Sequence, residues 1–232
     1  MNKPKASEEV RTWERGEVLP LQFRIIKIQK YDIIHNISTN YGKKQGECKG
    51  VSKGECKMGD YKNMNITIDR AKAQDAAEII ELSKIIGSES DNLSFDKNGI
   101  PVTVEEEAEV LAKLENSDKE AHFVARKDSK IVGWVHYTVC SKKRMAHRGE
   151  FGICVRKSEN GKGIGSMLLR HILEFAKETC HSEVVSLEVR SDNFGAIALY
   201  KKFGFEKIGT FKGFFKIDGE LIDFDIMQKF LN

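Results

Sequence analysis

No stretch of this 232-residue sequence stays apolar over the roughly 18 residues that a transmembrane helix needs. The first 17 residues are polar and contain no apolar segment of the kind that a secretory signal requires. From these two absences we expect a cytoplasmic protein that does not act at a membrane.

Cysteine is scarce and odd in number, with five residues in a chain long enough to fold without disulfide bonds. We therefore expect reduced thiols. Cys48 and Cys56 lie eight residues apart, but no second close pair completes a zinc site, so we expect no bound metal.

An excess of one charge sign is also missing, because the formal net charge of +3 is too small to indicate nucleic-acid binding. Residues 1–64 hold 13 Lys+Arg against 8 Asp+Glu, so the basic excess lies there. A solvated linker explains this distribution better than a binding tail does.

The sequence changes character at Asn65. Before it, residues 19–25 and 30–38 show strand patterns, and residues 40–63 are rich in Gly and Lys, as a linker would be. We interpret residues 1–64 as an N-terminal extension of unassigned role, too short for a core of its own, and residues 65–232 as one domain.

Strand and helix patterns alternate through residues 65–232. Strands are expected at 65–71, 121–126, 130–139, 150–155, 184–189, 205–215 and 220–230. Helices are expected at 75–86, at 104–114 after a capping box of Thr103 and Glu106, from near Gly163, and at 193–203 before Gly204. This order predicts an α+β or mixed α/β domain built on one sheet.

Three glycines, Gly161, Gly163 and Gly165, alternate at the start of the third of these helices. Free N–H groups and the positive end of the helix dipole meet there, and the missing Cβ atoms let an anion approach the backbone. The pattern predicts a phosphate-binding loop. Arg156 stands where a P-loop needs glycine, and Ser166 stands where a dinucleotide fingerprint needs it, so neither pattern fits.

The loop from Asn160 to Gly165 resembles the [QR]-x-x-G-x-[GA] pyrophosphate loop of the GCN5-related N-acetyltransferase (GNAT) superfamily, with Asn160 replacing Gln or Arg. The same superfamily's motif N-x-x-A-x-x-L-Y-x-x-x-G-F is matched by Asn193, Ala196, Leu199, Tyr200, Gly204 and Phe205. The resemblance covers residues 65–231. It implies a GNAT-like fold, with a mixed, largely antiparallel central sheet and flanking helices.

The resemblance also implies acetyl-CoA as co-substrate. In the superfamily the strand expected here at 150–155 carries a bulge and splays from the next one, and pantetheine lies between them. Ile153, Cys154 and Val155 would line that gap, and backbone groups of Ile153 and Val155 would bind pantetheine. Asn193 would contact the CoA arm. The pyrophosphate would be held by Asn160, Gly161, Lys162, Gly163, Ile164, Gly165 and Ser166.

By the same resemblance the protein is an N-acetyltransferase that transfers acetyl directly to a primary amine. Tyr200, at the superfamily's tyrosine position, would be the acid, and Glu188 the base. Glu188 lies between two apolar residues of a strand, which favours a raised pKa. Glu150 and a water chain are alternative bases. Cys154 has no His/Asp partner placed by sequence, so we interpret it as a small strand residue rather than a nucleophile.

The acceptor is less well indicated. The resemblance implies that the two helices within 75–114 and the last hairpin wall its site. Glu89, Asp91 and Asp96 give the segment 88–99 an acidic character that suits a cation. The ending resembles the ribosomal-protein and polyamine acetyltransferase branches at Asp218, Gly219, Asp223 and Met227. These features favour a small amine, a polyamine or a protein N-terminus, and leave a homodimer open.

Two other classes of function stay open. One is a non-catalytic module that binds acetyl-CoA as a sensor. The other is a nucleotide-binding enzyme that uses the glycine loop for NAD or ATP. The paired matches at Asn193 and Tyr200 favour the acetyltransferase over both.

Overall fold

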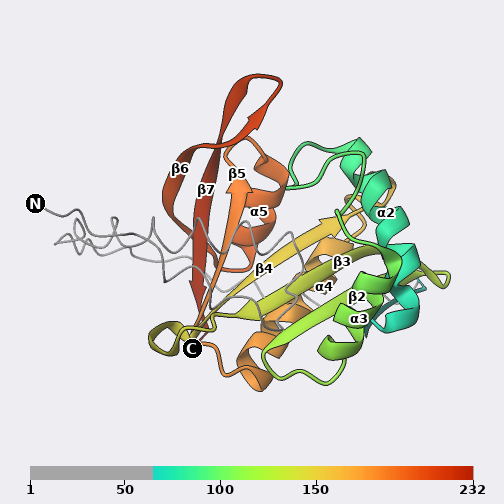
Figure 1. Ribbon diagram of the computed structural model, residues 1–232. Helices are drawn as coiled ribbons and strands as arrows, with labels where there is room; N and C mark the ends of the chain where they lie inside the picture. Colours follow the sequence, from blue (N-terminus) through green and yellow to red (C-terminus); the bar gives the residue numbers. More distant parts are fainter. Residues whose placement is uncertain (1–64, 232) are drawn as a thin grey trace, which may run out of the picture. The chain divides into compact units, whose positions relative to one another are not determined.

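The computed structural model describes residues 65–231, so the two strands expected within residues 1–64 lie outside the described part. Within residues 65–231, seven strands form one sheet in the order β1-β2-β3-β4-β5-β7-β6 (Figure 1). Neighbouring strands are antiparallel throughout, except β4 and β5, which run parallel. The mixed, largely antiparallel sheet is therefore confirmed.

The expected elements are confirmed in type and order. The strands are β1 (Ile66–Arg70), β2 (Glu120–Lys127), β3 (Lys130–Val139), β4 (Arg148–Val155), β5 (Val184–Arg190), β6 (Glu206–Ile217) and β7 (Glu220–Phe230). The helices are α2 (Ala76–Glu89), α3 (Val104–Leu114), α4 (Ile164–Glu174) and α5 (Phe194–Lys202), and a π-helical segment, Phe175–Thr179, follows α4. Helix α2 runs three residues further than expected, which places Glu89 on the helix.

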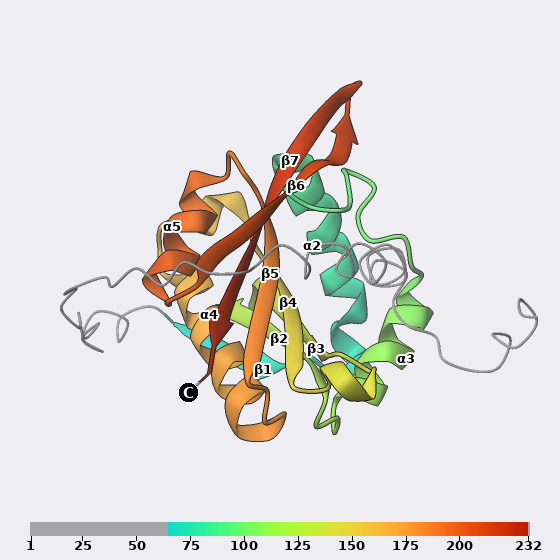
Figure 2. The ribbon, with the colours of Figure 1, turned by 90° about the vertical axis from the view of Figure 1, so that its left-hand side faces the viewer.

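Helices cover both faces of the sheet, as Figure 2 shows. We call them the α4 face, covered by α4 and α5, and the α2 face, covered by α2 and α3. Ile164, Leu168 and Ile172 recur every four residues along α4, so they share one side of the helix and are buried against the sheet. No helix of the described part is long and apolar enough to cross a membrane.

The capping box expected before α3 is confirmed. Thr103 Oγ1 accepts from the N–H of Glu106 at 3.2 Å, and Glu106 Oε2 accepts from the N–H of Thr103 at 2.9 Å. Two N–H groups that the first turn leaves without helical partners are thereby satisfied. The segment before α3 is tied to the fold as well, because the N–H of Ile100 donates to Ser83 Oγ on α2 at 3.0 Å.

Strands β6 and β7 form a long hairpin that projects beyond the rest of the sheet (Figure 1). Asp218 and Gly219 form its turn with φ of 49° and 89°, the left-handed values that a tight hairpin turn requires. The hairpin expected from the strands at 205–215 and 220–230 is confirmed. The β6–β7 pairing shifts register twice, between Lys207 and Gly209 and between Phe211 and Phe215.

Candidate active site

Strands β4 and β5 separate soon after they meet. They pair only at three positions, Arg148 with Val184, Gly149 with Val185 and Glu150 with Ser186. Beyond Glu150, β4 continues to Val155 paired only with β3, and β5 continues to Arg190 paired only with β7. The two strands diverge toward their ends (Figure 1), and we call the region between their unpaired parts the opening.

The prediction of a bulge in β4 is wrong. The β3–β4 register is continuous from Gly133↔Val155 to Val139↔Gly149. The register shift of the neighbouring β2–β3 pair falls between Ala125 and Arg126, where Val132 of β3 is the extra residue. A bulge is one way to turn a strand away from its neighbour, but twist alone also separates strands whose pairing has ended. The splay between β4 and β5 therefore forms without a bulge.

The free edge of β4 presents backbone groups to this opening. The C=O of Arg148 accepts from Cys140 and the N–H of Arg156 donates to Val132, so even-numbered residues of β4 bond toward β3. Because the direction alternates along a strand, the N–H and C=O of Ile153 and Val155 point toward β5, where no strand partner remains. Their predicted role with pantetheine is compatible with this geometry. The backbone of Cys154 is directed at β3 instead.

The glycine loop leads from β4 into α4. Gly163 is the N-cap of α4 with φ of 83°, a conformation that L side chains rarely adopt. Gly161 and Lys162 are exposed, and the Lys162 ammonium lies 3.1 Å from Glu159 and 2.8 Å from the C=O of Ser158. The loop thus presents backbone N–H groups at the positive end of a helix, while its lysine bends back on the loop.

A cavity of about 540 Å³ lies between the end of α2 and the start of α5. Its lining residues are Glu89, Ser90, Asp91, Asn92, Arg190, Asp192, Asn193, Phe194 and Gly195. Glu89 joins the cavity to the glycine loop, because Glu89 Oε2 accepts from the N–H of Lys157 at 2.8 Å and Oε1 lies 3.9 Å from Arg156. Glu89 therefore lies on α2 and contacts the segment that leads into the glycine loop.

Asn193 and Phe194 form the α5 side of this cavity. Asn193 Oδ1 accepts from the N–H of Ala196 at 3.2 Å and so caps α5. Its contact with the CoA arm stays a prediction. Phe194 is 76% exposed, unusual for a phenylalanine, and sequence reasoning missed both it and Arg190 because nothing in their spacing marks them.

Tyr200 lies on the side of α5 that packs on the sheet, within the core of the α4 face. Its ring contacts Phe151 of β4 and Phe205 at centroid distances of 5.9 and 6.0 Å. Burial, and next the nearby Cys154, raises the pKa of Tyr200 well above its ordinary value. The phenol therefore keeps its proton through the neutral range, as a proton donor must.

Glu188 lies on the other face of the sheet. Leu187 and Val189 belong to the core of the α4 face, so alternation directs Glu188 to the α2 face, partly exposed. Glu150, also partly exposed, points to the same face because its register partner Ser186 is two residues from Glu188. Both candidate bases border the opening, and their roles stay predictions.

Cys154 is buried among apolar side chains of the α2 face. Burial raises the pKa of its thiol well above the ordinary value, which disfavours the thiolate that a nucleophile needs. The interpretation of Cys154 as a small strand residue fits this environment. Among the described residues no cluster of three or more His, Cys, Asp or Glu could hold a metal ion; Cys48 and Cys56 lie outside that part.

The fold and the site together define a protein class. Residues 90–205, half of the chain, match the model of the acetyltransferase (GNAT) family. A crystal structure of an acetyltransferase of the GNAT family from Streptococcus pneumoniae superposes with a TM-score of 0.69 at 32% identity, covering 72% of this chain and 99% of that one. The chain belongs to the acetyltransferase (GNAT) family.

Two curated relatives give the family context. The L-amino acid N-acetyltransferase AaaT of Escherichia coli (strain K12) is 36% identical over 100 residues, which is 43% of this chain and 62% of AaaT. The N-alpha-acetyltransferase RimI of Mycobacterium tuberculosis is 34% identical over 99 residues, 42% of this chain and 60% of RimI. The chain thus spans less than two thirds of the length of either relative.

Proposed function

We propose that the protein is an acetyl-CoA-dependent N-acetyltransferase that moves the acetyl group directly to a primary amine. The splay between β4 and β5 carries this proposal. Tyr200 approaches it from the α4 face, and Glu188 and Glu150 border it on the α2 face. Side chains on opposite faces of a sheet can act on the same atoms only where two strands have separated.

The donor side of the opening suits acetyl-CoA. An extended chain with amide groups can pair with the N–H and C=O of Ile153 and Val155, which otherwise have no strand partner on that side. A diphosphate suits the glycine loop at the start of α4, where N–H groups and the helix dipole favour anions. Acetyl-CoA, the acetyl donor of this family, combines both features.

Direct transfer requires three proton movements. Glu188 accepts the proton of the ammonium form and passes it to water, and the amine nitrogen then attacks the thioester carbonyl carbon, so that a C–N bond forms while the C–S bond breaks. The nitrogen bonded to the acetyl carbon then loses its second proton to Glu188. Tyr200 donates its hydroxyl proton to the departing sulfur, which the raised pKa of the phenol permits at neutral pH. Both side chains recover their starting protonation by exchange with water.

The acceptor class is the finer part of the proposal. AaaT is named for L-amino acids and RimI for N-alpha groups. Together with the tail residues Asp218 and Asp223, they support an amino acid, a polyamine or a protein N-terminus as acceptor.

The test is an assay of free thiol release from acetyl-CoA with the full chain and a panel of amino acids, peptides, polyamines and aminoglycosides. Release that depends on an amine supports the enzyme. Binding of acetyl-CoA by calorimetry without release above background across the panel would favour the sensor alternative instead. No heat at millimolar acetyl-CoA would contradict both.

A further inference from the structure

The two faces of the sheet carry different kinds of core. On the α4 face one hydrophobic cluster runs without interruption from β2 to β7, through Phe123, Val135, Phe151, Leu187 and Met227. On the α2 face the core is split into two clusters. The first lies under α2 and α3 and reaches as far as Cys154 of β4, and the second lies on the β6–β7 hairpin around Phe211, Phe224 and Ile226.

The strip between these two clusters is polar: Ser186 and His136 are buried there, and Glu150 and Glu188 are partly exposed. Its floor is Gly152 of β4, which is exposed and has no atom within 4 Å of the position a Cβ would take. Gly152 pairs with His136 of β3 on one side. Across the opening, Glu188 of β5 pairs with Ile226, which belongs to the second cluster. Glu150 and Glu188 therefore place two partly exposed carboxylates along a polar strip of an otherwise apolar face.

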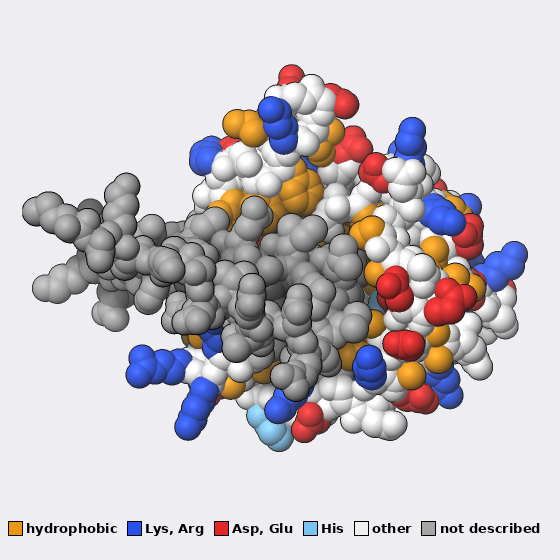
Figure 3. Space-filling model, in the orientation of Figure 1, with side chains coloured by type: hydrophobic (Ala, Val, Ile, Leu, Met, Phe, Trp, Pro, Cys, Tyr) orange, Lys and Arg blue, Asp and Glu red, His pale blue; other side chains and the backbone are white. Residues whose placement is uncertain are grey.

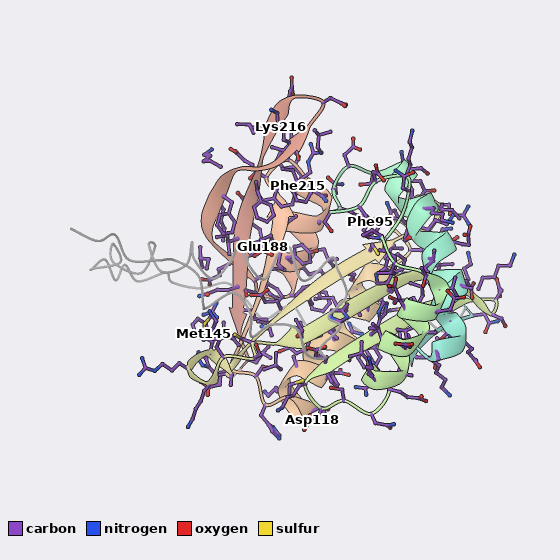
Figure 4. All side chains as sticks on the ribbon, viewed as in Figure 1. Phe95, Asp118, Met145, Glu188, Phe215 and Lys216 are labelled. Carbon is purple, nitrogen blue, oxygen red and sulfur yellow. The ribbon has the colours of Figure 1, made fainter. Side chains whose placement is uncertain are left out.

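Aromatic rings flank the strip on both sides. Phe95, from the segment after α2, stacks on Trp134 with centroids 6.3 Å apart, and Trp134 pairs with Cys154. On the hairpin, Phe215 packs on Phe224 at 4.3 Å, and Phe224 pairs with Arg190 of β5. Figure 4 shows Phe95 and Phe215 on opposite sides of the opening and Glu188 on the β5 side.

These aromatic walls are only partly covered. Phe95, Phe214 and Phe215 are all half-buried, and Phe214 stacks with Phe215 at 5.4 Å. Hydrophobic side chains show at the base of the projecting hairpin in Figure 3. Ligand sites often leave aromatic surface accessible, because an apolar group that covers this surface removes it from water and so binds favourably.

We propose that this strip selects an acceptor whose α-amino group adjoins a large apolar side chain. The carboxylates of Glu150 and Glu188 attract the ammonium, and the rings of Phe95 and Phe215 cover the apolar side chain. The inference rests on the proposed function and specifies its acceptor. A free amino acid and a peptide N-terminus share this chemistry and differ in whether the α-carboxyl is charged.

The test compares acceptors at fixed acetyl-CoA by kcat/KM. Phenylalanine amide and glycine amide measure the apolar contribution, phenylalanine and the peptide Phe-Ala-Ala-Ala separate the two sources, and spermidine represents polyamines. We expect a preference of at least about tenfold for phenylalanine amide over glycine amide, the usual range for an apolar pocket.

Two variants of the aromatic walls and one control test whether Phe95 and Phe215 cause the preference for phenylalanine amide. Phe95→Ala and Phe215→Ala are each expected to reduce the phenylalanine-to-glycine ratio by at least about fivefold, with the KM for acetyl-CoA unchanged. Leu221→Ala is the control, since Leu221 is 68% exposed on the same hairpin and alternates to the other face from Phe224. Phe95→Leu, which keeps an apolar side chain, covers the case in which an alanine variant fails to fold.

The outcomes separate the two proposals. Amine-dependent thiol release with a preference for spermidine or glycine amide, or ratios unchanged in the wall variants, would overturn the inference and leave the acetyltransferase standing. No release with any amine would overturn both. A higher kcat/KM for the peptide than for phenylalanine assigns the site to a polypeptide N-terminus, and the reverse assigns it to a free amino acid.

Discussion

Tyr200 combines a fixed ring with a hydroxyl whose proton is held tightly. Phe151 and Phe205 pack on the ring, so Tyr200→Phe keeps the packing and removes only the hydroxyl. We expect kcat to fall about a hundredfold, with the KM for acetyl-CoA within about twofold, because an acid acts on the leaving group rather than on donor binding. Steady-state kinetics measure this split. Unchanged kcat would remove Tyr200 from the reaction.

Glu188 as base makes a prediction about pH. An α-amine has a pKa near 8, so at pH 7 most acceptor molecules are ammonium ions that must lose a proton before they react. Well above pH 8 most of them are already neutral amines. Glu188→Gln is therefore expected to lower kcat/KM about a hundredfold at pH 7 and to approach the wild type as pH rises above 8.

Glu150→Gln is the matched comparison for this profile, because Glu150 borders the same opening on the same face. We expect it to retain the wild-type pH dependence. The opposite assignment, with the profile changed in Glu150→Gln and not in Glu188→Gln, would make Glu150 the base. If neither variant changes the profile, a water chain carries the proton.

Away from the opening, Glu107 of α3 and His122 of β2 form a buried pair, with Glu107 Oε1 and His122 Nδ1 4.0 Å apart. Burial raises the pKa of Glu107 to about 7 and lowers the pKa of His122 to about 4. Both shifts favour the neutral forms, so between about pH 4 and about pH 7 the pair is mostly uncharged rather than a salt bridge.

The raised pKa of Glu107 has a consequence for stability. Below pH 4.5 the Glu107 carboxyl is protonated in both the folded and the unfolded chain. Between pH 4.5 and about 7 it ionises only in the unfolded chain, so the free energy of unfolding decreases as pH rises. Glu107→Gln does not ionise and is expected to gain up to about 3 kcal/mol over the wild type between pH 4.5 and 8. Denaturant unfolding at the two pH values measures this change, and a difference that is constant with pH would contradict the buried, neutral carboxyl.

At the scale of elements, the start of α4 joins a structural requirement to a binding one. Gly163 has φ of 83° and caps the helix at the loop proposed to hold the diphosphate. An L residue is strained there, so Gly163→Ala is expected to cost about 1–2 kcal/mol of unfolding free energy and, by displacing the N–H groups, to raise the KM for acetyl-CoA several-fold.

Gly219→Ala separates the two effects. Gly219 has φ of 89° at the hairpin turn and nothing within 4 Å of a Cβ position, so it carries similar strain without belonging to the loop. Thermal unfolding should show comparable losses in both variants, and kinetics should show a higher KM for acetyl-CoA only in Gly163→Ala. Equal KM values in the two variants would contradict the role of the loop in donor binding.

At the scale of the whole molecule, the splay divides the sheet into two blocks that share only three residue pairs, β1 to β4 and β5 to β6. A donor lying between β4 and β5 would bind both blocks in the folded state and neither in the unfolded chain. Acetyl-CoA at 100 times its Kd is therefore expected to add about 2.7 kcal/mol of unfolding free energy. Thermal unfolding with acetyl-CoA measures this, with NAD and ATP as controls; stabilisation by those nucleotides alone would favour the nucleotide-enzyme alternative.

Local patterns in the sequence determined the elements and much of the candidate site. Features that act within a few residues can be recognised before the fold is known. Examples are the four-residue recurrence of Ile164, Leu168 and Ile172, the capping box at Thr103 and the turn at Gly219. The glycine loop and the motif around Tyr200 are local as well, and they identified the family.

Only the tertiary structure decided how these pieces meet. Strand order and register decide three features of the site. Strand β4 separates from β5 beyond Glu150 without a bulge, Glu188 and Tyr200 lie on opposite faces of the sheet, and Gly152 is exposed between them. The burial that shifts the pKa of Glu107 and the position of Glu89 against the glycine loop have the same origin. These relations join residues far apart in the chain, and no spacing within one segment carries information about them.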